Sequence, residues 1–106
     1  MSLFALKPGV SIKGLQPETL LGIFLVKQVY ESFGLDFVVT SVVEGAHKVG
    51  SLHYKGLAFD GRISNIQDPG MISKIVEKCK YYLGPQWDVI LEMEKVHIHF
   101  EFDPKS

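Results

Sequence analysis

The sequence contains very little cysteine. Cys79 is the single cysteine among 106 residues, so an internal disulfide is excluded. This usage fits a reducing compartment. The charged and aromatic neighbours of Cys79 indicate a structural position in a helix, without a ligand partner.

Excess charge and long apolar runs are also missing. The formal net charge is -1 at pH 7 and no cluster of Lys and Arg occurs, which argues against nucleic acid as a partner. The most apolar run, residues 20–26, is far shorter than the ~20 residues that span a bilayer, so we expect no membrane partner. Residues 1–7 have neither the basic start nor the apolar core of a signal peptide. We therefore expect the protein to be cytoplasmic as synthesised.

The first helix is predicted to follow an extended lead-in, residues 3–16. Pro17 is suited to the first helical position and Gly34 to the stop. Between them, apolar residues recur at helical spacing and are expected to face the core. They are Leu20, Leu21, Phe24, Val26, Val29, Tyr30 and Phe33.

A second helix is predicted from Asp68-Pro69, with the acid as N-cap, to about Leu83, where Gly84 stops it. Its expected inward side chains are Ile72, Ile75, Val76, Cys79, Tyr82 and Leu83.

The remaining segments read as strands. Residues 35–43 form a β-branched run that predicts a central strand, residues 57–62 alternate in polarity, and residues 87–102 suit a hairpin. We therefore expect one α+β domain over residues 1–106, a small, mainly antiparallel sheet with two main helices packed on it.

The strand that contains Asp60 places an acid among small apolar residues. Alternation puts Leu57 and Phe59 on one face, and Ala58, Asp60 and Arg62 on the other. A buried carboxylate needs a partner, because a bare buried charge is strongly destabilising. An ion pair with Arg62 and a bound metal would both satisfy Asp60.

A second polar series occurs near the C-terminus, again with apolar residues at alternate positions. Its polar face carries His97, His99, Glu101 and Asp103, and its apolar face carries Ile98, Phe100 and Phe102. Taken alone, this pattern is common in half-exposed strands. Together with His53 and Asp60, however, the two histidines complete a set of nitrogen and oxygen donors that suits a tetrahedral catalytic zinc with one open position.

These residues form a recognisable string. The sequence contains Ser51-x-His53-x-x-Gly56-x-Ala58-x-Asp60 and, further on, His97-x-His99. This resembles the zinc peptidases of the D-alanyl-D-alanine carboxypeptidase and phage endolysin type, which cut peptides of the bacterial cell wall. The hedgehog signalling domain has a similar zinc site on a similar fold. The resemblance covers residues 40–104 and implies a reduced hedgehog/D-alanyl-D-alanine peptidase fold, a Zn²⁺ cofactor and a peptidoglycan peptide as substrate.

By this resemblance, His53 and Asp60 are the first two zinc ligands. The third ligand is expected to be His99, because in relatives with both histidines the second usually binds and the first lies beside the metal. His97 is the alternative ligand and is otherwise expected to act in catalysis. Relatives commonly carry an arginine after the strand that here contains Thr40-Ser41, and this sequence lacks it.

Two glutamates could act on the zinc-bound water. If residues 87–92 run out and the chain returns from His97, counting back across the turn places Glu92 opposite His97. Glu92 is therefore the expected base. Glu94, three residues before His97, is the alternative. Ser51, Tyr54, Arg62 and His47 are candidate substrate contacts or groups that orient the ligands.

The residues and the resemblance together predict a zinc metallopeptidase that hydrolyses peptidoglycan peptides as a carboxypeptidase or endopeptidase. By the same resemblance, we expect the protein to be encoded by a phage or prophage and to be released to the cell wall by a separate route. The alternative is a non-catalytic zinc-binding domain of a phage-related structural or interaction protein.

Overall fold

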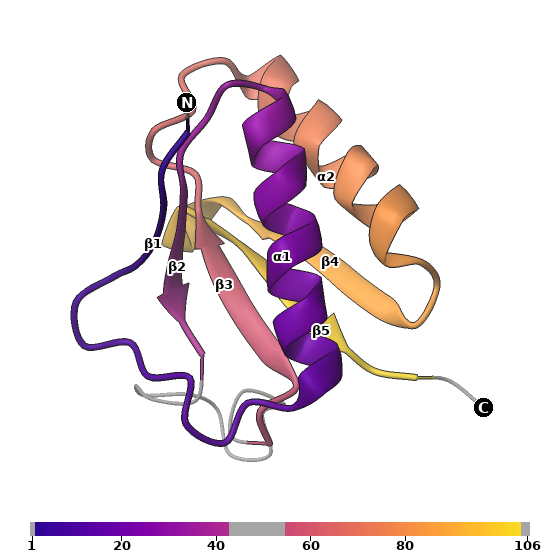
Figure 1. Cartoon of the computed structure of the whole chain (residues 1–106). Helices are drawn as coiled ribbons and strands as arrows, with labels where there is room; N and C mark the ends of the chain where they lie inside the picture. Colours follow the sequence, from indigo (N-terminus) through magenta and orange to yellow (C-terminus); the bar gives the residue numbers. More distant parts are fainter. Residues whose placement is uncertain (1, 43–54, 105–106) are drawn as a thin grey trace.

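A computed structural model describes residues 2–42 and 55–104, which form a sheet with helices on one face (Figure 1). In chain order the elements are β1 (Phe4–Leu6), α1 (Pro17–Ser32), β2 (Phe37–Ser41), β3 (Ala58–Arg62), α2 (Pro69–Leu83), β4 (Trp87–Glu92), the short 3-10 helix η1 (Met93–Lys95) and β5 (His97–Phe102). The predicted α+β class is confirmed.

The five strands lie in the order β1-β2-β3-β5-β4. β1 runs parallel to β2 and every other neighbouring pair is antiparallel, so the sheet is mixed. The prediction of an extended lead-in missed β1, in which Phe4 aligns with Phe37 of β2. The predicted central strand, residues 35–43, is shorter in the structure and spans Phe37–Ser41.

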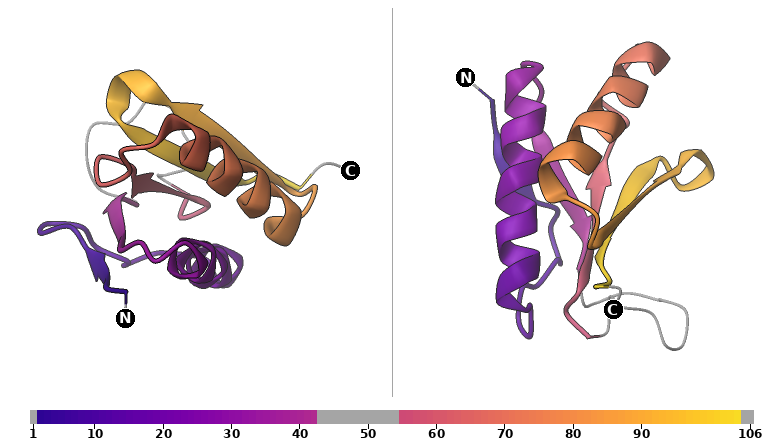
Figure 2. Two further views of the ribbon diagram at one scale, coloured as in Figure 1. Left: turned by 90° about the horizontal axis from the view of Figure 1, so that it is seen from above. Right: turned by 90° about the vertical axis from the view of Figure 1, so that its right-hand side faces the viewer.

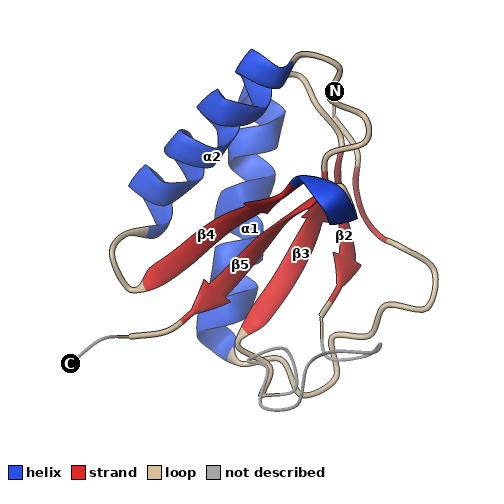
Figure 3. Cartoon of the chain, turned by 180° about the vertical axis from the view of Figure 1, so that it is seen from behind, coloured by secondary structure: helices blue, strands red, loops and turns tan. Residues whose placement is uncertain are grey.

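Both helices lie on the same side of the sheet, with α1 across its middle and α2 beside it over β4 (Figure 2). Seen from behind, β3, β4 and β5 lie in front of α1 (Figure 3). One face of the sheet therefore packs against helices. We call the opposite face, which neither helix covers, the open face.

Helix α1 begins at Pro17 as predicted, but its buried stripe is narrower than the apolar stripe in the sequence. Its large buried side chains are Ile23, Val26, Val29 and Tyr30. Leu20, Leu21 and Phe24 were expected in the core and are exposed. The sheet and α2 cover only part of the helix circumference, so these three side chains face outward, where Phe24 packs on Phe4 of the edge strand.

Helix α2 has the predicted bounds. The Asp68 side chain accepts a hydrogen bond from the Gly70 N–H at 2.9 Å, and Gly84, with φ of 88°, follows the last helical residue. Tyr82 was predicted to face inward and is 53% exposed. Cys79 is fully buried, and this burial raises the pKa of its thiol to about 12, which keeps the thiol protonated and unreactive.

The core lies between the sheet and the helices. Phe59 of β3 and Phe100 of β5 are directly opposite one another, fully buried and stacked with 4.7 Å between ring centroids. Successive side chains of a strand point to opposite faces. The neighbours Asp60 and His99 must therefore point to the open face.

No helix in the described part of the chain is long and apolar enough to cross a membrane.

Gly56 joins the segment before β3 to the start of α1. Its carbonyl oxygen accepts hydrogen bonds from the Thr19 hydroxyl at 2.8 Å and the Gln16 N–H at 3.0 Å. Its φ is 72°, and a Cβ at this position would lie 2.1 Å from the Gly14 carbonyl oxygen. Backbone conformation and lack of space thus both require glycine here.

We expect Gly56→Ala to lower the free energy of unfolding more than Gly34→Ala. Gly34 has the same φ of 72°, but a Cβ there would meet nothing within 4 Å. The control therefore reports the left-handed conformation alone, about 1–2 kcal/mol, and the clash at Gly56 should add about 1–3 kcal/mol. Urea denaturation of both variants measures the difference, and equal losses would show that the Gly14 carbonyl moves aside freely.

Candidate metal centre

Three neighbouring strands bring the polar residues together on the open face. In the β3–β5 ladder Asp60 is opposite His99, and in the β4–β5 ladder Glu92 is opposite His97. Directly opposite residues in antiparallel strands share a face, with Cβ atoms about 5 Å apart. The predicted hairpin, with Glu92 facing His97 across the turn, is confirmed by this register.

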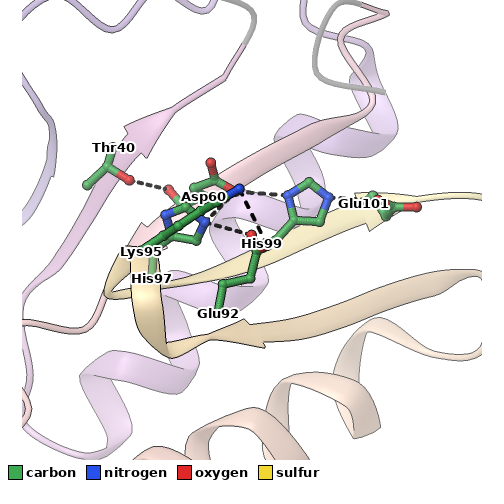
Figure 4. Close-up of polar contacts among 7 residues, drawn as sticks. All are labelled: Thr40, Asp60, Glu92, Lys95, His97, His99 and Glu101. Atoms are coloured by element: carbon green, nitrogen blue, oxygen red, sulfur yellow. Dashed lines mark hydrogen bonds and ion pairs between the residues drawn. The ribbon is translucent and has the colours of Figure 1, made fainter. Parts of the chain in front are cut away.

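Asp60 is at the centre of the group. It is 5% exposed, and its Oδ1 lies 2.9 Å from His99 Nδ1 and 3.7 Å from His97 Nε2 (Figure 4). Asp60 thus pairs with the two imidazoles. The ion pair with Arg62 that the sequence also allowed is not among these contacts. A buried carboxylate between two imidazoles strongly favours a cation at this point, whether a proton or a metal.

Glu92 approaches from β4. Its Oε1 lies 2.8 Å from His97 Nε2, and its Oε2 lies 3.7 Å from the ammonium of Lys95, in η1. The contact with His97 is short and partly shielded, whereas Lys95 is 67% exposed, so its ion pair adds little to stability.

His99 has a carboxylate at each ring nitrogen. Its Nε2 lies 2.7 Å from Glu101 Oε1, and its Nδ1 lies against Asp60. Burial lowers the pKa of His99, but the hydrogen bonds and negative charges of Asp60 and Glu101 together raise it above the ordinary value of 6.5. Without a metal, the His99 imidazole holds its proton more tightly than a free histidine.

The group has the composition and spacing of a metal site. Asp60, Glu92 and His99 each offer one ligand atom, and these atoms all lie within 4.8 Å of one another. Two carboxylates and one imidazole could hold a divalent cation. A second acidic group, Asp88, Glu101 and Asp103, has similar spacing without a histidine.

The remaining predicted residues are distributed as follows. Four of them lie outside the part of the chain that the structure describes: His47, Ser51, Tyr54 and His53, the predicted first zinc ligand. Glu94 is exposed in η1 and is not part of the group. Arg62 is half-buried opposite His97, with a buried Nε that has no hydrogen-bond partner.

Two residues that contact the group, Glu101 and Lys95, are given no role by the sequence analysis. Strand alternation places Glu101 on the same face as His99, two residues further along, and this spacing is the signal that could have indicated the contact. Lys95 belongs to the turn, where no periodic pattern indicates the direction of a side chain.

Comparisons with protein-family models, with curated proteins and with solved structures found no match. The likeness to the hedgehog/D-alanyl-D-alanine peptidase fold therefore stays a prediction based on the sequence motif.

The raised pKa of His99 predicts a pH dependence of stability in metal-free protein. Because the folded-state pKa exceeds the unfolded value, the contribution of protonated His99 is fully present below the unfolded pKa and is lost as pH rises through the folded pKa. With a chelator present, the difference in unfolding free energy between wild type and His99→Gln should fall as the pH rises from below the ordinary histidine pKa of 6.5 through the raised pKa of the folded state. Denaturant titrations measure it.

With zinc added, the trend should reverse, because protons compete with the metal for the same imidazole. A difference in unfolding free energy that does not change with pH in the chelated protein would contradict the proposed charge state of His99.

Proposed function

We propose that the protein is a zinc-dependent peptidase that hydrolyses peptide bonds of bacterial cell-wall peptidoglycan. The observation that carries the proposal is that Asp60 and His99, the proposed ligands, meet Glu92, the proposed base, from three strands, with side-chain N and O atoms within 4.8 Å of one another. The cell-wall substrate and a phage or prophage source come from the sequence motif.

Zinc is the proposed metal because of the donor types. Asp60 supplies a carboxylate oxygen and His99 an imidazole nitrogen, and His53 would supply a second nitrogen. Two imidazoles and one carboxylate, with the fourth position open, form a common catalytic zinc set. Zinc in such a site acidifies water and polarises a carbonyl group.

Glu92 is proposed as the general base. It lies across the hairpin from His97, and the 2.8 Å contact between Glu92 Oε1 and His97 Nε2 fixes its carboxylate beside Asp60 and His99. From this place Glu92 can take a proton from the attacking water and give it to the leaving amine. His97 orients Glu92 and can bear positive charge while Glu92 holds the proton.

The substrate would lie along the open face. Ser51, Tyr54 and His47, with Arg62 at the end of β3, are the proposed contacts to the peptide. Arg62 has five N–H donors, and those on its outer nitrogens suit a carbonyl or carboxylate of the peptide.

A second candidate is a non-catalytic zinc-binding domain of a phage-related structural or interaction protein. The observation that favours it is that Glu92 lies close enough to Asp60 and His99 to bind the same metal ion. If Glu92 binds zinc beside His53, Asp60 and His99, all four tetrahedral positions are filled, as in structural zinc sites, and no water can be activated.

Glu92→Gln separates the two functions. For the peptidase, we expect the variant to keep one equivalent of zinc and to lose about 10²–10⁴-fold in the release of amino groups from purified peptidoglycan, because the base is missing. Glu94→Gln is the matched control on the same turn and should keep activity. Metal analysis and amine labelling measure the two properties.

Other outcomes assign the function differently. Wild type that binds zinc and cuts nothing, together with a Glu92→Gln variant that loses zinc, would identify the non-catalytic domain. Loss of activity in Glu94→Gln alone would make Glu94 the base.

Zinc content should depend on Asp60. Asp60→Asn keeps the shape of the side chain but removes its charge, and we expect it to bind zinc about 10²-fold or more weakly. Asp68→Asn, at the cap of α2 and away from the site, is the control for charge and should bind zinc like wild type. Competition with a chromophoric chelator measures both affinities, and equal affinities would remove Asp60 from the ligand set.

A further inference from the structure

Glu101 makes a contact that the proposed reaction does not use. It follows His99 by two residues in β5, so both side chains lie on the open face. Glu101 Oε1 is 2.7 Å from His99 Nε2, while His99 Nδ1 is 2.9 Å from Asp60 Oδ1 (Figure 4). The imidazole of His99 is thus held at both nitrogens.

The surroundings make this contact strong. Glu101 is paired with Ala58 of β3 and Asp88 of β4 across the two ladders. The side chains of His99 and Glu101 are 14% and 22% exposed, so water competes little for the hydrogen bond. A charge-assisted hydrogen bond that is shielded in this way is about twice as strong as a neutral one.

The contact has a consequence for the tautomer of His99. An ionised carboxylate only accepts hydrogen bonds, so Nε2 must carry a proton that it donates to Glu101. The same holds for Nδ1 beside Asp60, so without a metal both nitrogens of His99 carry a proton. A metal held together with Asp60 would replace the proton on Nδ1 and leave Nε2–H donating to Glu101.

His97 is held differently. Both of its carboxylate contacts, with Glu92 at 2.8 Å and with Asp60 at 3.7 Å, are made by the same nitrogen, Nε2. Of the two histidines, His99 therefore has the arrangement of a metal ligand supported from behind.

We propose that Glu101 is a positioning residue that fixes the Nε2–H tautomer of His99, so that Nδ1 binds the metal together with Asp60. The inference rests on one part of the proposed function, the metal site, and does not require that the protein cut a peptide. A carboxylate behind a ligating histidine orients the ring and makes the ligand more basic.

Glu101→Ala tests the role through zinc affinity, measured by chelator competition. We expect the dissociation constant to rise about 10–100-fold, as for other carboxylates behind a zinc-bound histidine. Glu101→Gln keeps an oxygen that accepts from Nε2–H and should recover most of the affinity. Asp103→Ala removes a nearby negative charge and should bind zinc within about twofold of wild type, because Asp103 is not shown in contact with His99.

Nitrogen NMR of zinc-loaded wild type gives a readout that does not depend on any variant folding. Long-range ¹H–¹⁵N spectra should show His99 with a metal-bound Nδ1 and a protonated Nε2. In Glu101→Gln the same tautomer should persist, with faster exchange of the Nε2 proton, because a neutral acceptor holds it less tightly.

Several results would overturn the inference. Zinc on Nε2 of His99 in wild type would refute it directly. Equal zinc affinity in Glu101→Ala and wild type, or equal weakening in Glu101→Ala and Asp103→Ala, would reduce Glu101 to a surface charge. Wild type without zinc affinity would overturn the proposed function as well, whereas zinc binding without hydrolysis would leave the assignment of Glu101 supported by the affinities and spectra.

Discussion

The pairing of β3 with β5 in one register is the constraint on which the site depends. Phe59 and Phe100 face each other and stack beneath the helices, both fully buried. Because strand faces alternate, this stacking forces Asp60 and His99 to face each other on the open side. A slip of one residue in either strand would turn the ring of that strand out of the core, so the packing of the aromatic pair also holds the polar pair in place.

The charges of the site follow from that arrangement. Asp60, Glu92 and Glu101 surround the imidazoles of His97 and His99 through contacts of 2.7–2.9 Å. So many acceptors on a partly buried surface require positive charge among them, which a proton on His99 supplies and a divalent cation could supply in its place. Metal binding and protonation are thus competing solutions to the same electrostatic problem.

The architecture does not by itself establish the chemistry, since one fold serves many functions. Both helices contribute to the core, and the polar group comes from the strands and the turn between β4 and β5. The proposed metal site therefore depends on which atoms approach one another on the open face. Because the comparisons found no match, the peptidase activity and the cell-wall substrate are proposed from the sequence motif.

Local rules were sufficient for part of the molecule. The bounds of α2 were predictable because a capping acid and a terminal glycine act within one helical turn, and Glu92 could be placed opposite His97 because a short hairpin sets its own register. The sequence also predicted that Asp60 and His99 project from polar strand faces, because alternation is local.

Tertiary structure decided what depends on partners distant in the sequence. β1 was missed because its pairing with β2 joins residues more than thirty positions apart, and Leu21 and Phe24 were misplaced because helical spacing does not say how much of a helix its neighbours cover. The meeting of Asp60 with His99 depends in the same way on the strand order, in which β5 lies between β3 and β4. The sequence by itself determined which side chains share a face, whereas only the folded sheet decided which faces meet, because hydrophobic packing selects the strand order from the whole chain at once.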